Sequence, residues 1–315
     1  MLISQENNYL ALLNAIGIPG VRDGIKVFLT QELFSLARLN KVQLLYAQST
    51  ATVAEDLMNK HTQTIQTIIE VAHILNTNNI NYAVFKTIKP FISTPSDIDI
   101  LVPDADLQRA KILLSKQGYS NVTKDRFCIT MQKKTNVDLY LHPSVANIPY
   151  LNREILMRYK HVTDLQGSKI SVLSNEAEFI AVSSHSFYKE QMVTLNDFIT
   201  LAILAEIGDL KKISEIADEL IVCDAVLMVL AVCKNIMQDF QVPLKLLGLI
   251  ETMDPPHIDV AKMPYKFPLR AVLKTMLNKI RTDRQTREYF PKAILADLSK
   301  RHILDVFKHL TRETY

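Results

Sequence analysis

The spacing of apolar residues changes twice along this 315-residue chain, and this pattern limits the folds that the chain can adopt. Up to about residue 78, apolar residues recur every three or four positions, which is typical of amphipathic helices. From residue 79 to residue 173 short β-prone runs replace this spacing, and from residue 174 the helical spacing returns. We therefore expect an α+β protein, in which a small mixed sheet carries helices on one face.

This reading divides the chain into a helical N-terminal region (1–78), an α/β core (79–173) and a larger helical C-terminal domain (174–315). Asn175 and Glu178 have the spacing of a capping box at the first helix of that domain. Within the core a helix should begin near Asp104 and end at Gly118. Strands are expected over residues 82–85, 98–102, 119–122, 126–132 and 136–141, with an edge strand over 170–173.

The composition of the chain argues against several other classes of protein. With 48% hydrophobic and 22% charged residues the chain can bury a substantial core. Its seven glycines argue against a fold that cradles phosphate chiefly with glycine backbone. The most apolar stretch, Leu220 to Cys233, falls short of the roughly 20 residues of a membrane span and contains Asp224. The three cysteines lack metal-binding spacing, and the start lacks a secretory signal, so we expect reduced thiols, a cytoplasmic location and no membrane contact.

The most informative segment is the short strand that contains Asp97 and Asp99. Side chains two apart in a strand share a face, so these two carboxylates point to one side and Ile98 to the other. Two neighbouring carboxylates repel each other unless a cation lies between them, and Mg²⁺ is a hard cation that prefers oxygen ligands. An isolated Asp-x-Asp pair is common, however, and strand-end aspartates often serve as turn or cap residues.

A third carboxylate strengthens the case for a metal site. Asp138 lies in the otherwise apolar run NVDLYLH, where a charge is disfavoured unless it is paired or bound to metal. If this strand lies beside the Asp97–Asp99 strand, the three acids can hold two metal ions and activate a hydroxyl nucleophile. Lys86 and Thr87, at the end of the preceding strand, offer a cation and a hydroxyl to phosphate oxygens. Lys89 is a weaker candidate for the same phosphate contact and is interpreted first as a solvated loop lysine, and His185 is interpreted as a hydrogen-bonded core or interface residue.

Together these residues resemble the DNA polymerase beta superfamily of nucleotidyltransferases. That pattern is a strand ending in Gly-Ser or Gly-Gly, a gap of roughly ten residues, an apolar-flanked Asp-x-Asp, and a third acid on a later strand. Thr87 falls where the family has its phosphate-binding serine, Asp97 and Asp99 match the metal pair, and Asp138 matches the third acid. More narrowly, the chain is similar to the uncharacterised nucleotidyltransferase family with a Lys-Gly turn, in which Lys86 matches the lysine and Thr87 replaces the glycine.

The resemblance implies transfer of a nucleoside monophosphate from an NTP, such as ATP, to an acceptor hydroxyl, with release of pyrophosphate. Asp97, Asp99 and Asp138 would be the catalytic residues and would bind Mg²⁺ or Mn²⁺; Lys86, Thr87 and Ser96 would contact the β- and γ-phosphates. The acceptor stays open among nucleic acid, protein and small molecule. The lost turn glycine leaves a second hypothesis open, a catalytically inactive scaffold that binds nucleotide or nucleic acid. A third is a helical interaction protein, which requires the three acids to lie apart.

Charge is unevenly distributed along the chain. Residues 262–315 contain 13 Lys and Arg against 5 Asp and Glu, whereas the whole chain has a net charge of only +3. Such a segment could contact RNA, although solvated helical faces would give the same composition.

Overall fold

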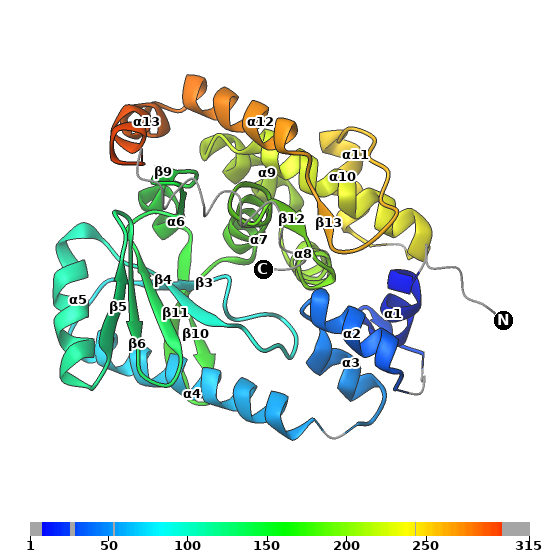
Figure 1. Cartoon of the computed structure of the whole chain (residues 1–315), viewed down its shortest axis with the longest axis horizontal. Helices are drawn as coiled ribbons and strands as arrows, with labels where there is room; N and C mark the ends of the chain where they lie inside the picture. The colour runs from blue at the N-terminus through cyan, green and yellow to red at the C-terminus, as the bar shows by residue number, and fades with distance from the viewer. Residues whose placement is uncertain (1–7, 26–28, 53, 243, 298–315) are drawn as a thin grey trace.

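The structure is a computed structural model that describes residues 8–25, 29–52, 54–242 and 244–297 (Figure 1). At its centre lies a seven-stranded sheet in the order β10-β11-β3-β4-β7-β6-β5. Two of its strand pairs, β11 with β3 and β4 with β7, are parallel, and the others are antiparallel. This mixed sheet confirms the α+β prediction, but helices pack against both of its faces and not against one face, as the sequence had suggested. The strands are β3 (Ala83–Phe85), β4 (Asp97–Leu101), β5 (Ser120–Lys124), β6 (Cys128–Gln132), β7 (Asn136–Tyr140), β10 (Lys160–Leu165) and β11 (Ser168–Leu173).

One face of the sheet is covered by two helices, α4 (Glu55–Thr77) and α5 (Asp104–Lys116). In Figure 1 α4 runs beneath the sheet and continues toward the N-terminal helices. Ile98 and Ile100 of β4 are buried in the core between the sheet and these helices. Since side chains alternate along a strand, Asp97 and Asp99 project to the opposite face.

The opposite face meets the helical C-terminal region. Helix α7 (Asn175–Ser184) continues without a break into a π-helical turn, His185–Lys189, and both are largely buried. Helix α8 (Leu195–Ile207) is buried from Leu195 to Ala205, so it forms the centre of this region. The other helices are α6 (Arg153–Arg158), α9 (Leu210–Glu219), α10 (Cys223–Phe240), α11 (Leu246–Met253), α12 (Leu269–Thr282) and α13 (Arg284–Asp297). Among the described helices, none is both long and apolar enough to cross a bilayer.

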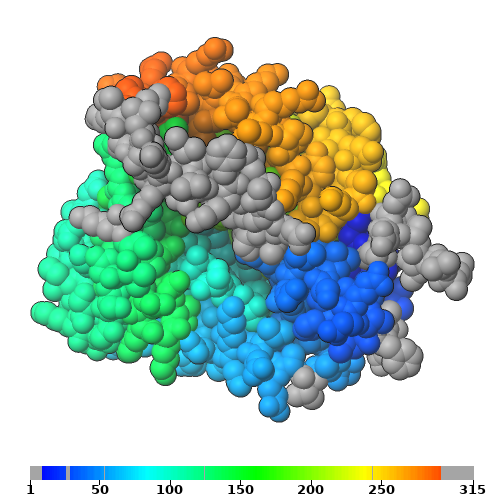
Figure 2. Space-filling model, viewed as in Figure 1, coloured from blue at the N-terminus to red at the C-terminus, as the bar shows by residue number. Residues whose placement is uncertain are grey.

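The N-terminal helices pack against this C-terminal region instead of standing apart from it, and Figure 2 shows them abutting the rest of the molecule. Asn40 is fully buried and joins the two parts. Its side-chain carbonyl accepts a hydrogen bond from the N–H of Leu195 at 3.1 Å, and its amide donates to the carbonyl of Met263 at 3.3 Å. The remaining elements are α1 (Asn8–Ile16), α2 (Gln31–Leu39), α3 (Gln43–Ser49), and the pairs β1–β2 (Gly17–Ile18, Arg22–Asp23), β8–β9 (Ser144–Val145, Ile148–Pro149) and β12–β13 (Met192–Val193, Tyr265–Lys266).

Three details differ from the sequence predictions. The expected edge strand, β11, lies inside the sheet, because β10 pairs with it and forms the edge. Helix α7 is capped by Ser174, whose hydroxyl accepts from the N–H of Ala177, so Asn175 and Glu178 do not form a capping box. Helix α5 starts at Asp104 as expected, but its N-cap is Pro103, whereas the sequence had suggested Asp104 as the cap. The boundaries of the three predicted regions stay a prediction.

We expect Phe198→Ala to lower the free energy of unfolding by about 3–5 kcal/mol, because truncating a buried phenylalanine loses its packing and leaves a cavity. Phe198 lies on α8 with no exposed surface. Urea titration followed by circular dichroism measures the change. Ile112→Ala is the control, since Ile112 is 54% exposed and its loss should cost less than about 0.5 kcal/mol. Equal losses in the two variants would contradict the prediction.

Candidate active site

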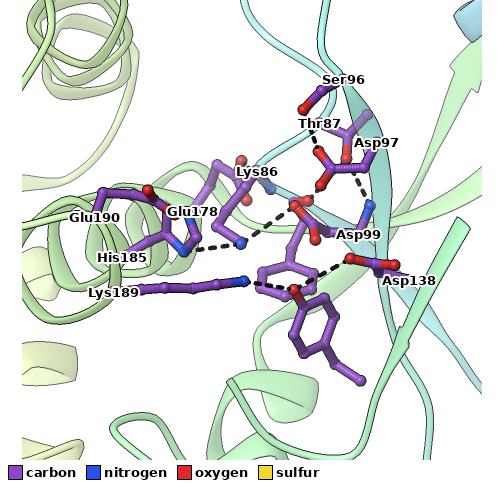
Figure 3. A network of polar contacts seen from close by, with 12 residues as sticks. Lys86, Thr87, Ser96, Asp97, Asp99, Asp138, Glu178, His185, Lys189 and Glu190 are labelled. Atoms are coloured by element: carbon purple, nitrogen blue, oxygen red, sulfur yellow. Dashed lines mark hydrogen bonds and ion pairs between the residues drawn. The ribbon is translucent and has the colours of Figure 1, made fainter. Parts of the chain in front are cut away.

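The three predicted acids meet on the face of the sheet opposite α4 and α5. Strands β4 and β7 are adjacent and parallel, and Asp99 pairs directly with Asp138 in their register. One carboxylate oxygen from each of Asp97, Asp99 and Asp138 lies within 4.8 Å of the others. Figure 3 shows the three side chains converging from the two strands. The hypothesis of a helical interaction protein required these acids to lie apart, and the structure contradicts it.

The carboxylate cluster fits a divalent cation. Within the described part of the chain, no hydrogen bond reaches the buried Oδ1 atom of Asp138. Burial, followed by the charge of Asp99, raises the pKa of Asp138 to about 6. Burial also raises the pKa of Asp99, although the ammonium group of Lys86 opposes that shift. Buried carboxylates without enough positive charge beside them are costly, and a hard cation with oxygen ligands would remove that cost.

We expect the affinity for Mn²⁺ to fall about tenfold for each pH unit below about pH 6, because a carboxyl group must lose its proton before it ligates a metal. The raised pKa of Asp138 sets the upper end of this range. Isothermal titration calorimetry between pH 8 and pH 5 measures the affinity, and circular dichroism at each pH checks that the protein stays folded. An affinity that is unchanged down to pH 5 would contradict this assignment.

Lys86 occupies a strained turn directly after β3. Its φ angle is 57°, in the left-handed region, and the N–H of Thr87 donates to the carbonyl of Phe85 at 2.7 Å. This is a three-residue turn that costs energy for any residue with a side chain. The buried carboxylate of Glu178 stabilises the turn by accepting from the N–H of Lys86 at 2.6 Å. A helix of the C-terminal region therefore compensates the strain of the turn. The turn directs the Lys86 side chain toward the acids.

The ammonium group of Lys86 lies between Asp99 and His185. It is 3.2 Å from Oδ2 of Asp99 and 3.1 Å from Nδ1 of His185. Burial, followed by the charge of Lys86, lowers the pKa of His185 to about 3, so its imidazole ring is neutral. Nε2 lies 3.1 Å from Oε1 of Glu190 and carries the proton in this arrangement, which leaves Nδ1 to accept from Lys86 and from Tyr150. His185 thus positions Lys86, a role beyond the core residue that the sequence suggested.

Thr87 and Ser96 have defined partners. The Thr87 hydroxyl accepts from the N–H of Asp99 at 2.9 Å and donates to the carbonyl of Phe85 at 3.2 Å, so it ties the turn to β4. The Ser96 hydroxyl donates to Oδ1 of Asp97 at 2.9 Å. Their contact with phosphate stays a prediction. The left-handed residue of the turn is Lys86, and Thr87 is not among the residues with positive φ, so the missing glycine at position 87 causes no backbone strain.

Two further residues near Asp138 were not predicted. The Lys189 ammonium donates to the Tyr140 hydroxyl at 3.0 Å, and that hydroxyl lies 3.5 Å from Oδ2 of Asp138. Burial alone would lower the pKa of Lys189, but the nearby carboxylates, Asp99 first, raise it. Lys189 therefore stays charged beside the acids. The π-helical turn that presents it has no recognisable signal in the sequence.

A cavity of about 300 Å³ opens beside Asp97 and Asp99. Lys86, Lys89 and the segment 93–96 contribute to its walls, together with residues of the N-terminal helices and of α7 and α8. Lys89 is half-buried and lines this cavity, so its interpretation as a solvated loop lysine is wrong. The site thus combines three acids with an adjoining basic cavity.

The described part of the basic C-terminal segment, residues 262–297, contains one buried lysine. Lys279 is 3% exposed, and its ammonium group donates to the carbonyls of Leu220 and Ile221 and pairs with Asp283 at 3.1 Å. This lysine stabilises the packing of α12 and is not available to a polyanion. Residues 298–315 lie outside the described residues, and the RNA contact stays a prediction.

Comparisons with solved structures give low similarity. A solution structure of the antibiotic-resistance factor ANT(2'')-Ia is 10% identical (TM-score 0.39) and covers 53% of this chain and 96% of that chain. A crystal structure of ANT(2'')-Ia in complex with adenylyl-2''-tobramycin is 8% identical (TM-score 0.38), covering 50% and 97%. An antigenic nucleotidyltransferase-like protein from Paracoccidioides brasiliensis is 13% identical (TM-score 0.34), covering 64% and 96%. Sequence identities and TM-scores this low do not indicate an activity for this chain.

The family comparison is more informative. No curated protein matches the chain in sequence. Residues 43–238, however, match a family described as uncharacterised nucleotidyltransferase, and this segment contains all three acids and the Lys86 turn. The match extends over more than half of the sequence and includes α3 to α9 and most of α10. The chain therefore belongs to the uncharacterised nucleotidyltransferase family, as its acid pattern had indicated.

Proposed function

We propose that this protein is a metal-dependent nucleotidyltransferase that transfers a nucleoside monophosphate from an NTP to an acceptor hydroxyl and releases pyrophosphate. The observation that carries this proposal is the cluster of Asp97, Asp99 and Asp138, within 4.8 Å of one another, beside a basic cavity. Mg²⁺ or Mn²⁺ bound there would neutralise the triphosphate and hold the attacking and leaving oxygens in line.

In this proposal the acceptor oxygen forms a bond to the α-phosphorus while the bond from that phosphorus to the bridging β-oxygen breaks. The acceptor proton leaves toward the carboxylate of Asp138, one of the three clustered acids, which acts as the general base. Asp97 and Asp99 would hold the divalent cation, which would stabilise the negative charge that develops on the transferred group. Lys86 contacts the phosphates as they develop charge, and Thr87 and Ser96 are proposed to contact the same phosphates.

The alternative of an inactive scaffold rested on the loss of the turn glycine and on the basic C-terminal segment, and only the first of these is addressed by the turn. The first argument weakens because the turn places its left-handed residue at Lys86 and holds it with Glu178, which makes a glycine at position 87 unnecessary. The acceptor class stays open among nucleic acid, protein and small molecule, because one fold serves many acceptors. We also propose a cytoplasmic location, in keeping with the three unpaired cysteines.

The test supplies each α-labelled NTP with Mg²⁺ or Mn²⁺ and three acceptor pools: total RNA, total protein and a small-molecule extract of the source cells. We expect metal-dependent label in one pool and pyrophosphate release with the wild type, and neither with Asp97→Asn. If no pool is labelled and no pyrophosphate appears above the level of Asp97→Asn, the proposed activity is wrong.

A further inference from the structure

The third acid, Asp138, has a hydrogen-bond partner on its own strand. Tyr140 follows it by two residues on β7, so both side chains project to the same face of the sheet. The Tyr140 hydroxyl donates to Oδ2 of Asp138 at 3.5 Å and accepts from the ammonium group of Lys189 at 3.0 Å. In Figure 3 Lys189 points toward Asp138, and dashed lines mark the two contacts between them. Two hydrogen bonds in series therefore join a lysine of the C-terminal region to a carboxylate of the sheet.

The chemistry of these groups fixes the direction of both hydrogen bonds. An ammonium group can only donate, so the Tyr140 oxygen accepts from Lys189 and keeps its own proton for Asp138. A hydroxyl that accepts from a cation is polarised, which strengthens the bond that it donates. Oδ1 of Asp138, in contrast, receives no hydrogen bond from the described part of the chain. The two oxygens of this carboxylate therefore differ, because Oδ2 is held and Oδ1 can still take a ligand.

The Tyr140 ring is itself fixed in position. It is 4% exposed and packs edge-on against Phe85, with the two ring centres 5.6 Å apart. The ammonium groups of Lys86 and Lys189 lie 5.4 Å and 5.5 Å from its centre, within the range of cation–π attraction. The hydroxyl therefore has a defined place from which to orient the carboxylate.

Lys189 is fixed by the π-helical turn that contains it. The residues on either side of it, Tyr188 and Glu190, are buried. Across the turn, Nε2 of His185 lies 3.1 Å from Oε1 of Glu190. Lys189 itself is half-buried, so its ammonium group is held near the Tyr140 hydroxyl by the packing of its neighbours.

We propose that Tyr140 and Lys189 are positioning residues, which orient the carboxylate of Asp138 so that Oδ1 is the oxygen that meets the cation and the acceptor. The terminal torsion of an aspartate is broad and roughly two-fold, so an unheld carboxylate would present either oxygen. Among the described residues that line the cavity beside Asp97, neither Tyr140 nor Lys189 occurs, whereas Lys86 does. A role through Asp138 therefore fits their place in the structure. This inference rests on the proposed function for the role of Asp138 as the proton acceptor.

Tyr140→Phe removes one oxygen atom and keeps the packed ring, so it tests the hydrogen bond alone. We expect it to weaken Mn²⁺ binding about tenfold, because the outer partners of a metal ligand typically contribute about 10–100-fold to metal affinity. Calorimetry on the full chain at pH 8 measures this affinity. Tyr159→Phe is the matched control, since it also removes a hydroxyl that donates to a carboxylate, that of Glu219 at 2.6 Å, which is not one of the clustered acids. The control should bind Mn²⁺ as the wild type does.

The transfer assay measures the second effect, with saturating Mn²⁺ and the acceptor pool that the wild type labels. Tyr140→Phe should lower kcat about tenfold and leave KM for the NTP within about twofold. Lys189→Met keeps the stem of the lysine and should lower kcat to a similar extent. The double variant should be no slower than Tyr140→Phe, because Lys189 acts through that hydroxyl, and residues in one series of contacts are not additive.

An unchanged Mn²⁺ affinity in Tyr140→Phe would overturn the inference, and so would a double variant whose rate falls by the product of the two single losses. A raised KM for the NTP in Lys189→Met would assign Lys189 to the nucleotide and would overturn it as well. Full transfer by Tyr140→Phe would overturn this inference and leave the proposed activity intact. If the wild type labels no pool while Tyr140→Phe still weakens Mn²⁺ binding, the proposed activity is wrong and the positioning of the metal ligand stands. Circular dichroism checks the fold of each variant, and Tyr140→Phe carries the test by itself if Lys189→Met does not fold.

Discussion

Asp138→Asn should abolish nucleotidyl transfer and, in the metal-free protein at pH 8, should increase the free energy of unfolding. The transfer rate should fall on the order of 10³-fold or more. Removal of a single electrostatic contact to the transition state typically lowers a rate by about 10²–10³-fold, and the loss here should be larger. Asp138 is both a metal ligand and the proton acceptor in the proposed reaction, so an amide cannot replace it. Labelled-NTP transfer measures the loss, with Asp125→Asn as control because Asp125 is exposed and is not one of the clustered acids.

The gain in stability follows from the pKa of Asp138, which rises from 3.8 to about 6 on folding. In the unfolded chain the carboxyl group ionises freely above its ordinary pKa, whereas in the folded protein it resists ionisation until about pH 6. The ionised carboxylate therefore destabilises the folded protein. This destabilisation is absent below pH 3.8, grows between pH 3.8 and about pH 6, and stays constant above about pH 6.

An asparagine at position 138 is uncharged, so it does not destabilise the folded protein in this way. The gain at pH 8 in EDTA should reach up to about 3 kcal/mol, since each unit of pKa shift corresponds to about 1.4 kcal/mol. Urea titration measures the gain, which should disappear near pH 4. A variant that is less stable than the wild type at pH 8 would show that Asp138 is not the uncompensated acid inferred here.

Lys86→Met should change metal binding and transfer in opposite directions. The ammonium group lies 3.2 Å from Asp99 and competes with any cation for that carboxylate. Removing it should raise the Mn²⁺ affinity on the order of tenfold. The free energy of this gain is a fraction of the roughly 4 kcal/mol with which two unit charges 4 Å apart interact near a protein surface. Transfer should fall about 10²–10³-fold, because a contact to the phosphates is lost.

Methionine keeps the length of the lysine stem and the same backbone requirement, so the turn itself should persist. Calorimetry with Mn²⁺ and labelled-NTP transfer measure the two effects, and Lys116→Met on the exposed surface of α5 is the matched control. A lower Mn²⁺ affinity would show that Lys86 supports the metal site rather than competing with the metal.

The three acids could be predicted because each stands out locally. Asp97 and Asp99 are two residues apart in a β-prone run, so alternation places them on one face of their strand, and Asp138 is a charge inside an apolar strand. Their convergence then required only that β4 and β7 be neighbours, which the structure confirms. The change of hydrophobic spacing likewise predicted the sheet and its two helical flanks.

The residues that complete the site could not be predicted, because their roles depend on contacts between distant segments. Glu178 has the spacing of a capping residue, yet it is buried against the Lys86 turn, 92 positions away in the sequence. Arg38 and Lys60 line the adjoining cavity as exposed helical residues, and nothing local separates them from ordinary solvated cations. Strand β10 was missed because most of its side chains are exposed and it lacks a buried alternating face.

Because His185–Lys189 forms a π-helical turn, a change in chain length there would alter this site in a way that side-chain replacement does not. A π turn contains one residue more than an α turn, and one residue of an α-helix corresponds to about 100° of rotation. Deleting a single amino acid from this turn would restore regular winding and rotate Lys189 away from the acids and Glu190 away from His185, with the composition of the site almost unchanged. Length variation here, rather than substitution, would be the most economical route to a relative that keeps the fold and loses the chemistry.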